Sequence, residues 1–196
     1  RQAASLFDPT SGSIDGIGNI SPARYINLLV QATYHPDSSE MQKKRYIKIA
    51  RLAADYFLVR GLIDPLDGGV YAGTQKTTSA LPQFTKTLSA QAHSMKALYE
   101  LYKATGDALY LKAADSISAY TEKHLTLPDG GYLLGVIHAL NQVLDNPCVW
   151  TLEEIEAALT EEEARLCVLA FGLKELGNIP LVDDPGRSYY RKNTLT

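Results

Sequence analysis

Residues 64–92 read DPLDGGVYAGTQKTTSALPQFTKTLSAQA, and this stretch joins two long helical patterns. Its Asp67-Gly68-Gly69 segment predicts a sharp turn, because glycine adopts positive φ angles at little cost. Val70 and Tyr71 then predict one or two extended residues. Pro82 fits the first turn of a helix, where its missing N–H costs nothing. Ordered loops of this length between helices are commonly functional, so we expect this one to organise the molecule.

A weaker copy of the turn lies further along, at Asp129-Gly130-Gly131-Tyr132. Its offset from the first copy is 129 minus 67, or 62 residues. A more degenerate third copy begins at Asp8, 67 minus 8 or 59 residues before the first. A period of about sixty residues, with two helices between copies, is typical of stacked α-hairpins. The loops should then gather at one end of the stack.

Apolar residues at spacings of three and four predict the helices. The predicted ranges are 22–33, 40–60, 83–104, 108–124, 152–159 and 161–176. Capping boxes at Ser39 with Gln42, and at Thr151 with Glu154, begin two of them. The expected inward faces of the third and fourth helices are Leu88, Ala92, Met95, Tyr99 and Tyr102, and Leu109, Ala113, Ile117 and Tyr120.

The remaining segments carry weaker patterns. Residues 132–149 fit a short strand pair but give no clear period, and residues 177–196 predict an irregular, partly disordered tail. The sequence therefore predicts an all-α protein of stacked helical hairpins, with one helical domain over 1–176 and a tail over 177–196.

Composition narrows the classes of partner. The chain has 196 residues, 45% hydrophobic and 21% charged, which is typical of a soluble globular protein with a single core. A net charge of −3 argues against nucleic acid as the main partner. The basic run 43–45, with Lys48 and Arg51, is typical of a solvated helix face. No segment approaches the ~20 apolar residues that cross a bilayer, so we expect no membrane partner.

Neither a metal site nor a cofactor is predicted. Cys148 and Cys167 show no CxxC and no metal-ligand spacing, and whether they pair is open. The histidines at 35, 93, 124 and 138 are dispersed. The chain starts at Arg1 rather than Met, so we expect a processed form or an excised piece, from the cytoplasm or, after processing, from the periplasm or outside the cell.

Four motifs in order carry a resemblance to a known family. They are Phe7-Asp8 with Gly12, Gly16-Ile17-Gly18 and Pro22; Asp64 with Gly68-Gly69-Val70 and residues 81–92; Val149-Trp150-Thr151 with Glu153-Glu154-Ile155; and Gly177-Asn178 with Asn193. On these motifs the chain resembles the helical region of the thioredoxin-domain-containing proteins typified by spermatogenesis-associated protein twenty. That region is similar to the six-hairpin, glycosidase-like α/α toroids, which implies carbohydrate metabolism and an (α/α)6 fold.

The departures from the family bear on catalysis. Where the family has His, Glu and Asp, this chain has Gln83, Thr85 and Ala90, and residues 136–139 replace an acidic Asp-Ala-Asp. A glycosidase needs two carboxylates around the scissile bond, and an epimerase needs a general base within reach. Neither can be placed, so no catalytic residue is assigned and the sequence argues against an enzyme. The thioredoxin domain is also missing.

Length is a further departure. A closed toroid of twelve helices needs roughly 350 residues, given typical helices and connections. The chain therefore predicts a half or truncated toroid, whose exposed inner faces would be covered by a second copy or by a missing half of the same chain.

The expected ligand-binding residues come from the loops and helix starts at the toroid mouth. They are Asp67, Tyr71, Gln83, His93, Asp129, Tyr132 and Trp150. Aromatic rings stack on sugars, although single aromatics are often core residues. The two aspartates also cap turns in many proteins.

Three functional hypotheses follow. The first is a degenerate, non-catalytic toroid protein that binds a carbohydrate-like ligand or serves as a scaffold. The second is a sugar epimerase or glycosidase-like enzyme whose catalytic residues lie in a missing half or partner chain. The third is an α-helical protein-interaction module.

Overall fold

The computed structural model describes residues 21–74, 81–137 and 146–195. The third glycine-turn copy at Asp8, the entry motif before Pro22, and His138 lie outside the described residues. The helices are α1 (Ala23–Thr33), α2 (Glu40–Ala53), η2 (Ala54–Leu62), α3 (Leu88–Thr105), α4 (Ala108–His124), α5 (Leu152–Ala158) and α6 (Glu161–Phe171). The strands are β1 (Thr85–Thr87), β2 (Gly135–Ile137), β3 (Val149–Trp150) and β4 (Asn193–Thr194).

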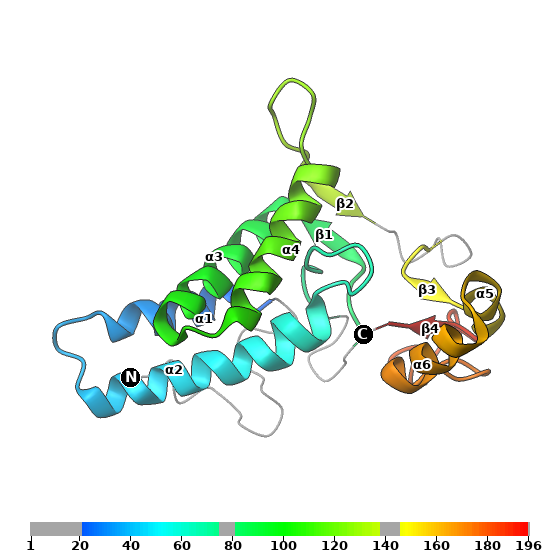
Figure 1. The fold of residues 1–196 in the computed structure, drawn as a ribbon, viewed down its shortest axis with the longest axis horizontal. Coiled ribbons are helices and arrows are strands. Elements are labelled where there is room, and N and C mark those ends of the chain that lie inside the picture. Colours follow the sequence, from blue (N-terminus) through cyan, green and yellow to red (C-terminus); the bar gives the residue numbers. More distant parts are fainter. Residues whose placement is uncertain (1–20, 75–80, 138–145, 196) are drawn as a thin grey trace.

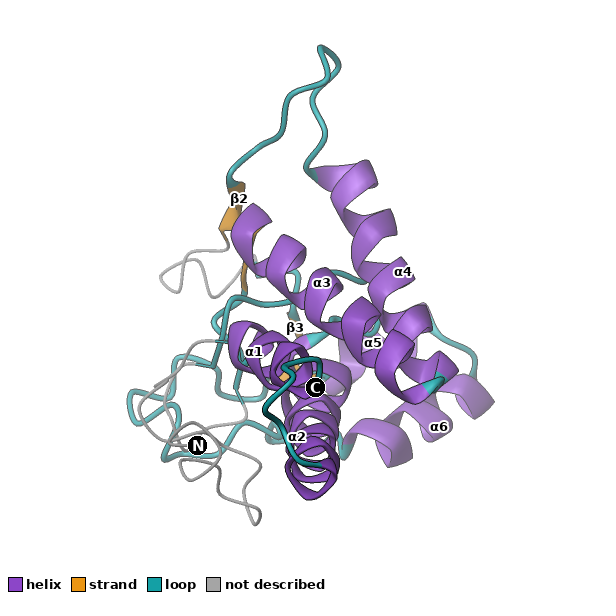
Figure 2. Ribbon diagram, turned by 90° about the vertical axis from the view of Figure 1, so that its left-hand side faces the viewer, coloured by secondary structure: helices purple, strands orange, loops and turns teal. Residues whose placement is uncertain are grey.

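Two helical hairpins form the body of the molecule. The α1–α2 hairpin packs beside the α3–α4 hairpin, with α1 against α3 (Figure 1). Figure 2 shows the same hairpins from the side, with α6 at the lower right. The core between the hairpins contains fully buried side chains from each, such as Ile26, Leu58, Leu98 and Ile117. The predicted all-α architecture of stacked hairpins is confirmed.

Local signals set several helix boundaries. Both predicted capping boxes are present, at Ser39 with Gln42 and at Thr151 with Glu154. A further capping box at Thr160 begins α6 and was not predicted. Gly106, at φ 72°, ends α3 in the left-handed conformation, and α4 has its predicted range. These termini follow from side chains that satisfy free backbone N–H groups.

The start of α3 was predicted five residues too early. Thr87 caps the helix by accepting a hydrogen bond from the Ala90 N–H, so α3 begins at Leu88. Pro82 is therefore not in a helix and instead forms an isolated bridge with Thr74. The intervening strand β1 pairs antiparallel with β2, with Lys86 opposite Val136.

The predicted inward face of α3 was wrong, whereas that of α4 was largely right, with Ile117 and Tyr120 buried and Ala113 packed against the core. The buried residues are Gln91, Ser94, Ala97, Leu98 and Leu101 on α3, and Tyr110, Ala114, Ile117 and Tyr120 on α4. Tyr99 is 50% exposed and Leu109 is 47% exposed. Small residues face the neighbouring helices because they let backbones approach closely, and the Gln91 amide bonds to the backbone of Val70.

Three other segments differ from the prediction. The helix expected to 60 changes after Ala53 into the π-helix η2. Strands occur within 132–149, but β2 pairs with β1 and β3 pairs with β4, so they do not form one strand pair. Helix α6 ends at Phe171, where Gly172 takes a left-handed conformation.

The C-terminal residues are tied to the second, smaller cluster of helices. The Asn178 amide donates to Phe171 and Thr194 carbonyl oxygens, and the Asn193 amide donates to Lys174. Part of the expected irregular tail is therefore the strand β4. Both cysteines are free in the structure, which settles the open pairing. No helix in the described ranges is long and apolar enough to span a membrane.

Candidate functional site

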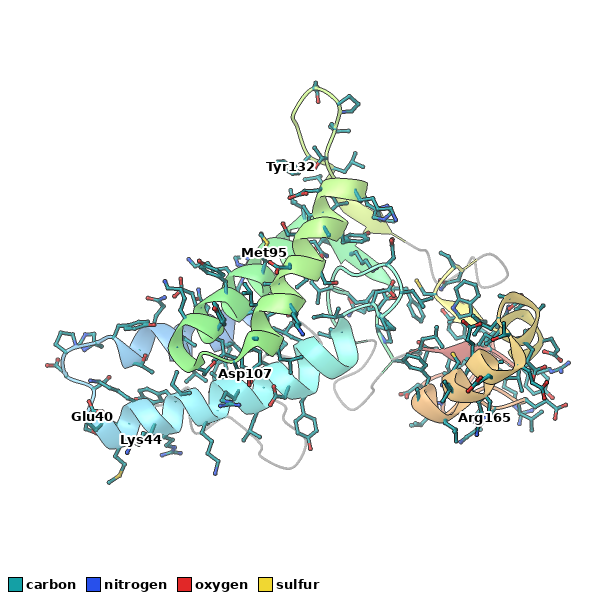
Figure 3. The ribbon with its side chains drawn as sticks, viewed as in Figure 1. Glu40, Lys44, Met95, Asp107, Tyr132 and Arg165 are labelled. Carbon is teal, nitrogen blue, oxygen red and sulfur yellow. The ribbon has the colours of Figure 1, made fainter. Side chains whose placement is uncertain are left out.

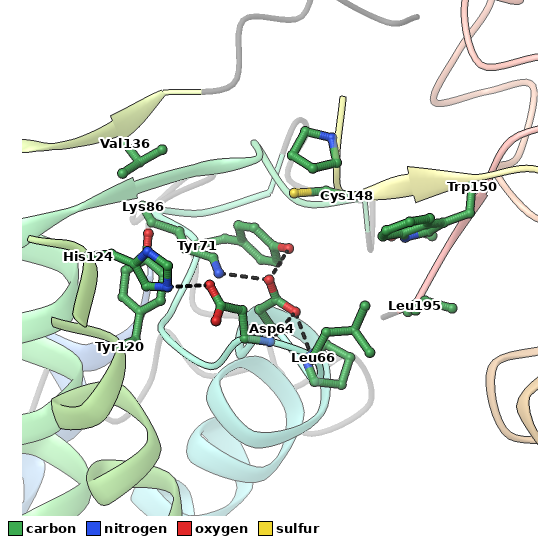
Figure 4. Close-up of a pocket in the computed structure, with 14 residues that line it drawn as sticks. Asp64, Leu66, Tyr71, Lys86, Tyr120, His124, Val136, Cys148, Trp150 and Leu195 are labelled. Carbon is green, nitrogen blue, oxygen red and sulfur yellow. Dashed lines mark hydrogen bonds and ion pairs between the residues drawn. The ribbon is translucent and has the colours of Figure 1, made fainter. Parts of the chain in front are cut away.

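A buried lysine holds the first glycine turn against the body. The Lys86 ammonium lies 2.7 Å from Asp64 Oδ2 and donates to the Gly68 carbonyl oxygen, also at 2.7 Å. The side chains of Lys86 and Asp64 are only 5% and 13% exposed. The same ammonium lies over two aromatic rings, 4.3 Å from the Tyr120 centroid and 5.1 Å from that of Tyr71 (Figure 4). Such an arrangement lowers the cost of burying a cation.

Asp64 shapes the turn that follows it. Its Oδ1 accepts from the backbone N–H of Leu66 at 2.9 Å, and its Oδ2 accepts from the Tyr71 hydroxyl at 3.1 Å. This is the Asx-turn chemistry typical of aspartate. Gly68 and Gly69 follow with φ of 71° each. A Cβ on Gly69 would lie 2.5 Å from the Tyr120 ring, so only glycine fits there.

Asp67 lies at the rim of the same turn, against the end of α4. Lys123 Nζ is 2.8 Å from Asp67 Oδ1, and His124 Nε2 is 2.6 Å from Oδ2. The His124 ring stacks at 4.8 Å on Tyr120. Partial burial opposes ionisation of Asp67, but the hydrogen bonds from Lys123 and His124 outweigh it and lower the pKa of the carboxyl.

This shift predicts a change in stability at acid pH. An aspartate has a pKa of about 3.9 in an unfolded chain, and the folded value of Asp67 is lower. The contacts of Asp67 therefore contribute fully to the free energy of unfolding above about pH 4, and this contribution disappears as pH falls through the folded pKa. Because the carboxyl is partly exposed, we expect less than ~1 kcal/mol. Urea unfolding of wild type and Asp67→Asn should differ at pH 6 and converge near pH 2; a constant difference would contradict the assignment.

These residues border a cavity of about 380 Å3 (Figure 4). Its other walls come from Val136 on β2, Trp150 on β3 and the segment before β3. The full lining is Asp64, Pro65, Leu66, Asp67, Tyr71, Lys86, Tyr120, His124, Val136, Pro147, Cys148, Trp150, Thr194 and Leu195. We call this the Lys86 cavity. It combines aromatic surface with hydroxyl, ammonium and carboxylate groups.

Burial keeps the cavity's weak acids protonated. Burial, followed by the nearby Cys148 and Asp64, raises the pKa of Tyr71 far above its usual value. Burial also raises the pKa of Tyr120 to about 12, and that of the Cys148 thiol against a smaller opposite effect of Tyr71. At neutral pH these groups remain O–H and S–H, and the cavity offers no thiolate nucleophile.

The structure divides the seven expected ligand residues. Asp67, Tyr71 and Trp150 meet in the Lys86 cavity. Gln83 and His93 line a separate cavity of about 500 Å3, bordered by the starts of α1 and α3. The other two, Asp129 and Tyr132, follow α4 in the sequence and border neither cavity; Tyr132 lies on the loop that projects beyond α4 (Figure 3). Of the two glycine turns, the first borders the Lys86 cavity, whereas the second borders neither of these two cavities.

The cavity lined by Gln83 and His93 offers fewer groups for binding or chemistry than the Lys86 cavity. The Gln83 side-chain amide already donates to the Thr74 carbonyl oxygen at 2.8 Å. Burial, then the charges of Arg24 and Lys96, lowers the pKa of His93. Ala90, which stands where the resembled family has an acid, also lines this cavity.

Sequence reasoning missed the residues that build the Lys86 cavity. Asp64 and Lys86 fall on the quoted family motifs, but no spacing rule showed that they would pair. Tyr120, His124 and Cys148 carried no signal of a site at all. Within residues 21–74, 81–137 and 146–195, no group of three or more His, Cys, Asp or Glu side chains is arranged to hold a metal ion.

Sequence comparison identifies relatives of part of the chain. No family model matches it. The human spermatogenesis-associated protein 20 is 25% identical over 157 residues, covering 69% of this chain and 19% of the relative's length. The mouse (Mus musculus) protein is 24% identical over 156 residues, with the same coverage. The resemblance to this protein is confirmed. The matched part of the chain spans about a fifth of the length of these two relatives.

Solved structures confirm the fold. A cellobiose 2-epimerase from Spirochaeta thermophila DSM 6192 superposes with a TM-score of 0.58 and 21% identity, over 69% of this chain and 35% of that one. A sugar epimerase from a ruminal bacterium superposes with a TM-score of 0.58 and 20% identity, over 79% of this chain and 43% of that one. A D-mannose isomerase superposes with a TM-score of 0.52 and 18% identity, over 70% of this chain and 39% of that one. The chain thus has part of the α/α-toroid fold of these sugar epimerases and isomerases.

Proposed function

We propose that this protein binds a carbohydrate-like small molecule in the Lys86 cavity without turning it over. The observation that supports this most is the meeting of Asp67, Tyr71 and Trp150 in one cavity. Trp150 offers flat apolar surface for a sugar ring, while Asp67 and His124 at the rim offer hydrogen-bonding groups for hydroxyls.

The absence of turnover rests on how the carboxylates are held. Asp64 is committed to Lys86, Tyr71 and the turn backbone. Asp67 is committed to Lys123 and His124. Because a glycosidase needs one protonated and one ionised carboxyl around a bond, two carboxylates fixed by cations are poorly suited to that reaction.

Ligand binding is tested with neutral mono- and disaccharides, cellobiose and mannose among them. A sugar that binds the folded state raises the melting temperature, because ligation stabilises only that state. We expect at least a tenfold weaker Kd by calorimetry in Trp150→Ala, since loss of one aromatic contact is worth ~1.4 kcal/mol or more. Tyr132→Ala, on the projecting loop, is the control and should bind as wild type. No stabilisation by any sugar would overturn the proposal.

A sugar epimerase or isomerase is the second candidate. It is supported by the fold of the solved neighbours and by the His124 imidazole, which lies beside Asp67 at the cavity and is a candidate base. Proton abstraction next to a sugar carbonyl would introduce deuterium from heavy water, which NMR detects. Incorporation that is lost in His124→Gln would favour the enzyme over the binding protein.

A further inference from the structure

The outer face of α2 carries a groove that plays no part in either cavity. Its volume is about 570 Å3, and its described lining comes from α2 and the start of η2: Lys43, Lys44, Ile47, Lys48, Arg51, Leu52 and Asp55. Ile47 and Leu52 are half-buried and form the apolar floor. Lys44, Lys48 and Arg51 are exposed at the rim, so the groove is apolar inside and cationic outside.

Two of the rim cations form no ion pair within the described chain, although the charge of Lys44 helps Lys43 to lower the pKa of Glu40. Lys43 pairs with Glu40 at 2.8 Å, and Arg51 pairs with Asp107 at 3.1 Å. Among residues 21–74, 81–137 and 146–195, neither Lys44 nor Lys48 forms an ion pair. Their charges are available to an acidic surface that approaches the groove.

Helix α6 presents a surface of the opposite kind. Glu162, Leu166 and Leu169 follow a spacing of four and three and therefore share one helical face. Leu166 is 53% exposed and Leu169 is 70% exposed, although leucine favours burial. Within the part of the chain that the structure describes, Glu162 forms no ion pair, whereas the neighbouring Glu163 carboxylate accepts the Thr160 N–H in the capping box.

A charge of each sign also matches at the edges of these two surfaces. Arg165 lies beside this face of α6, and Asp55 is the groove's carboxylate. Asp55 accepts a hydrogen bond from Tyr110 through Oδ1, which leaves its other oxygen for a cation. An α6 helix placed in the groove can thus bring Glu162 to the lysines and Arg165 to Asp55.

One chain does not make this contact with itself. In Figure 1 α2 and α6 occupy opposite ends of the molecule, and Figure 3 shows Lys44 and Arg165 far apart at those ends. An apolar groove with a cationic rim fits an amphipathic helix with an acidic residue, which is a common mode of helix recognition.

We propose that α6 of one copy docks in the α2 groove of a second copy. Leu166 and Leu169 then cover Ile47 and Leu52, while Glu162 faces Lys44 and Lys48. The contact is head to tail, so a pair of copies still has one free groove, on the copy that supplies α6, and one free α6, on the other, and the assembly grows into a ring or an open chain. Charged rim pairs make the association sensitive to salt.

The test uses the whole chain and sedimentation equilibrium at 20 mM and 500 mM NaCl. Wild type should show a mean mass above the 21.5 kDa monomer that rises with protein concentration and falls in high salt. Lys44→Glu/Lys48→Glu should be monomeric, and so should Glu162→Lys/Leu169→Lys. Mixing these two variants supplies one intact groove and one intact α6, so a 1:1 complex should form.

Matched controls separate docking from general charge effects. Lys96→Glu/Lys112→Glu changes the charge by the same amount at exposed sites outside the groove and should associate as wild type. Circular dichroism must show wild-type helicity in every variant. A wild type that is monomeric at all concentrations in low salt, association that survives Lys44→Glu/Lys48→Glu, or a mixture that stays monomeric would each overturn the proposal.

Discussion

Replacing Lys86 with Met should lower the free energy of unfolding by about 3–5 kcal/mol, because it leaves Asp64 as a buried charge without its cation. Met is close to Lys in shape and keeps contact with the flanking rings, so the loss reports on the ammonium. The Gly68 carbonyl oxygen would also lose its buried donor. Urea denaturation of the whole chain at pH 7 measures the effect.

The control for this prediction is Lys123→Met on the same turn. The Lys123 side chain is 67% exposed and pairs with Asp67 at the surface, where ion pairs contribute ~0–1 kcal/mol. If Lys86→Met costs no more than Lys123→Met, the buried pair does not hold the turn. The double variant Lys86→Met/Asp64→Leu should recover part of the lost stability, because no unpaired charge then remains buried. The recovery is only partial, because the double variant also loses the hydrogen bond from the Leu66 N–H to Asp64.

Gly69→Ala should be comparably severe, at about 2–5 kcal/mol. The residue has a φ of 71°, which costs a residue with a Cβ ~1–2 kcal/mol. The added Cβ would also lie 2.5 Å from the Tyr120 ring, and forcing atoms into a packed site typically costs a further ~1–3 kcal/mol. Because Tyr120 also contacts Lys86 and His124, the clash should disturb the whole cavity wall.

Gly106→Ala separates the two parts of that cost. Gly106 has nearly the same φ, 72°, but a Cβ there meets no atom within 4 Å. We therefore expect only the backbone cost, ~1–2 kcal/mol. Equal losses in Gly69→Ala and Gly106→Ala would show that the Tyr120 ring moves freely, and that the turn is not packed against α4 as described.

The helices were predictable where local chemistry decides them. Ser39 and Thr151 fixed two helix starts because their side chains satisfy backbone N–H groups, and Gly106 fixed an end. The faces of α3 were not predictable, because an apolar stripe through Met95 and Tyr99 does not say which side has a neighbour. Similarly, residues 54–62 span too few turns for a period to distinguish an α-helix from a π-helix.

The site was predictable only in part, for a related reason. Asp67, Tyr71 and Trp150 carried recognisable chemistry, and the structure brings them together. The Asp64–Lys86 pair spans 22 residues and forms only because β1 pairs with β2 while the glycine turn packs on Tyr120. His124 is an ordinary helix-terminal histidine in the sequence. Contacts of this kind depend on tertiary packing that no local pattern encodes.

The most direct test of the central claim is a two-dimensional 1H–15N NMR titration with the sugar that most raises the melting temperature. We predict saturable shifts of the Trp150 indole N–H and of the backbone amides of Leu66 and Asp67, with Gln83 and His93 unchanged. Shifts confined to Gln83 and His93, or no shift with any sugar, would contradict the assignment of the Lys86 cavity as the ligand site.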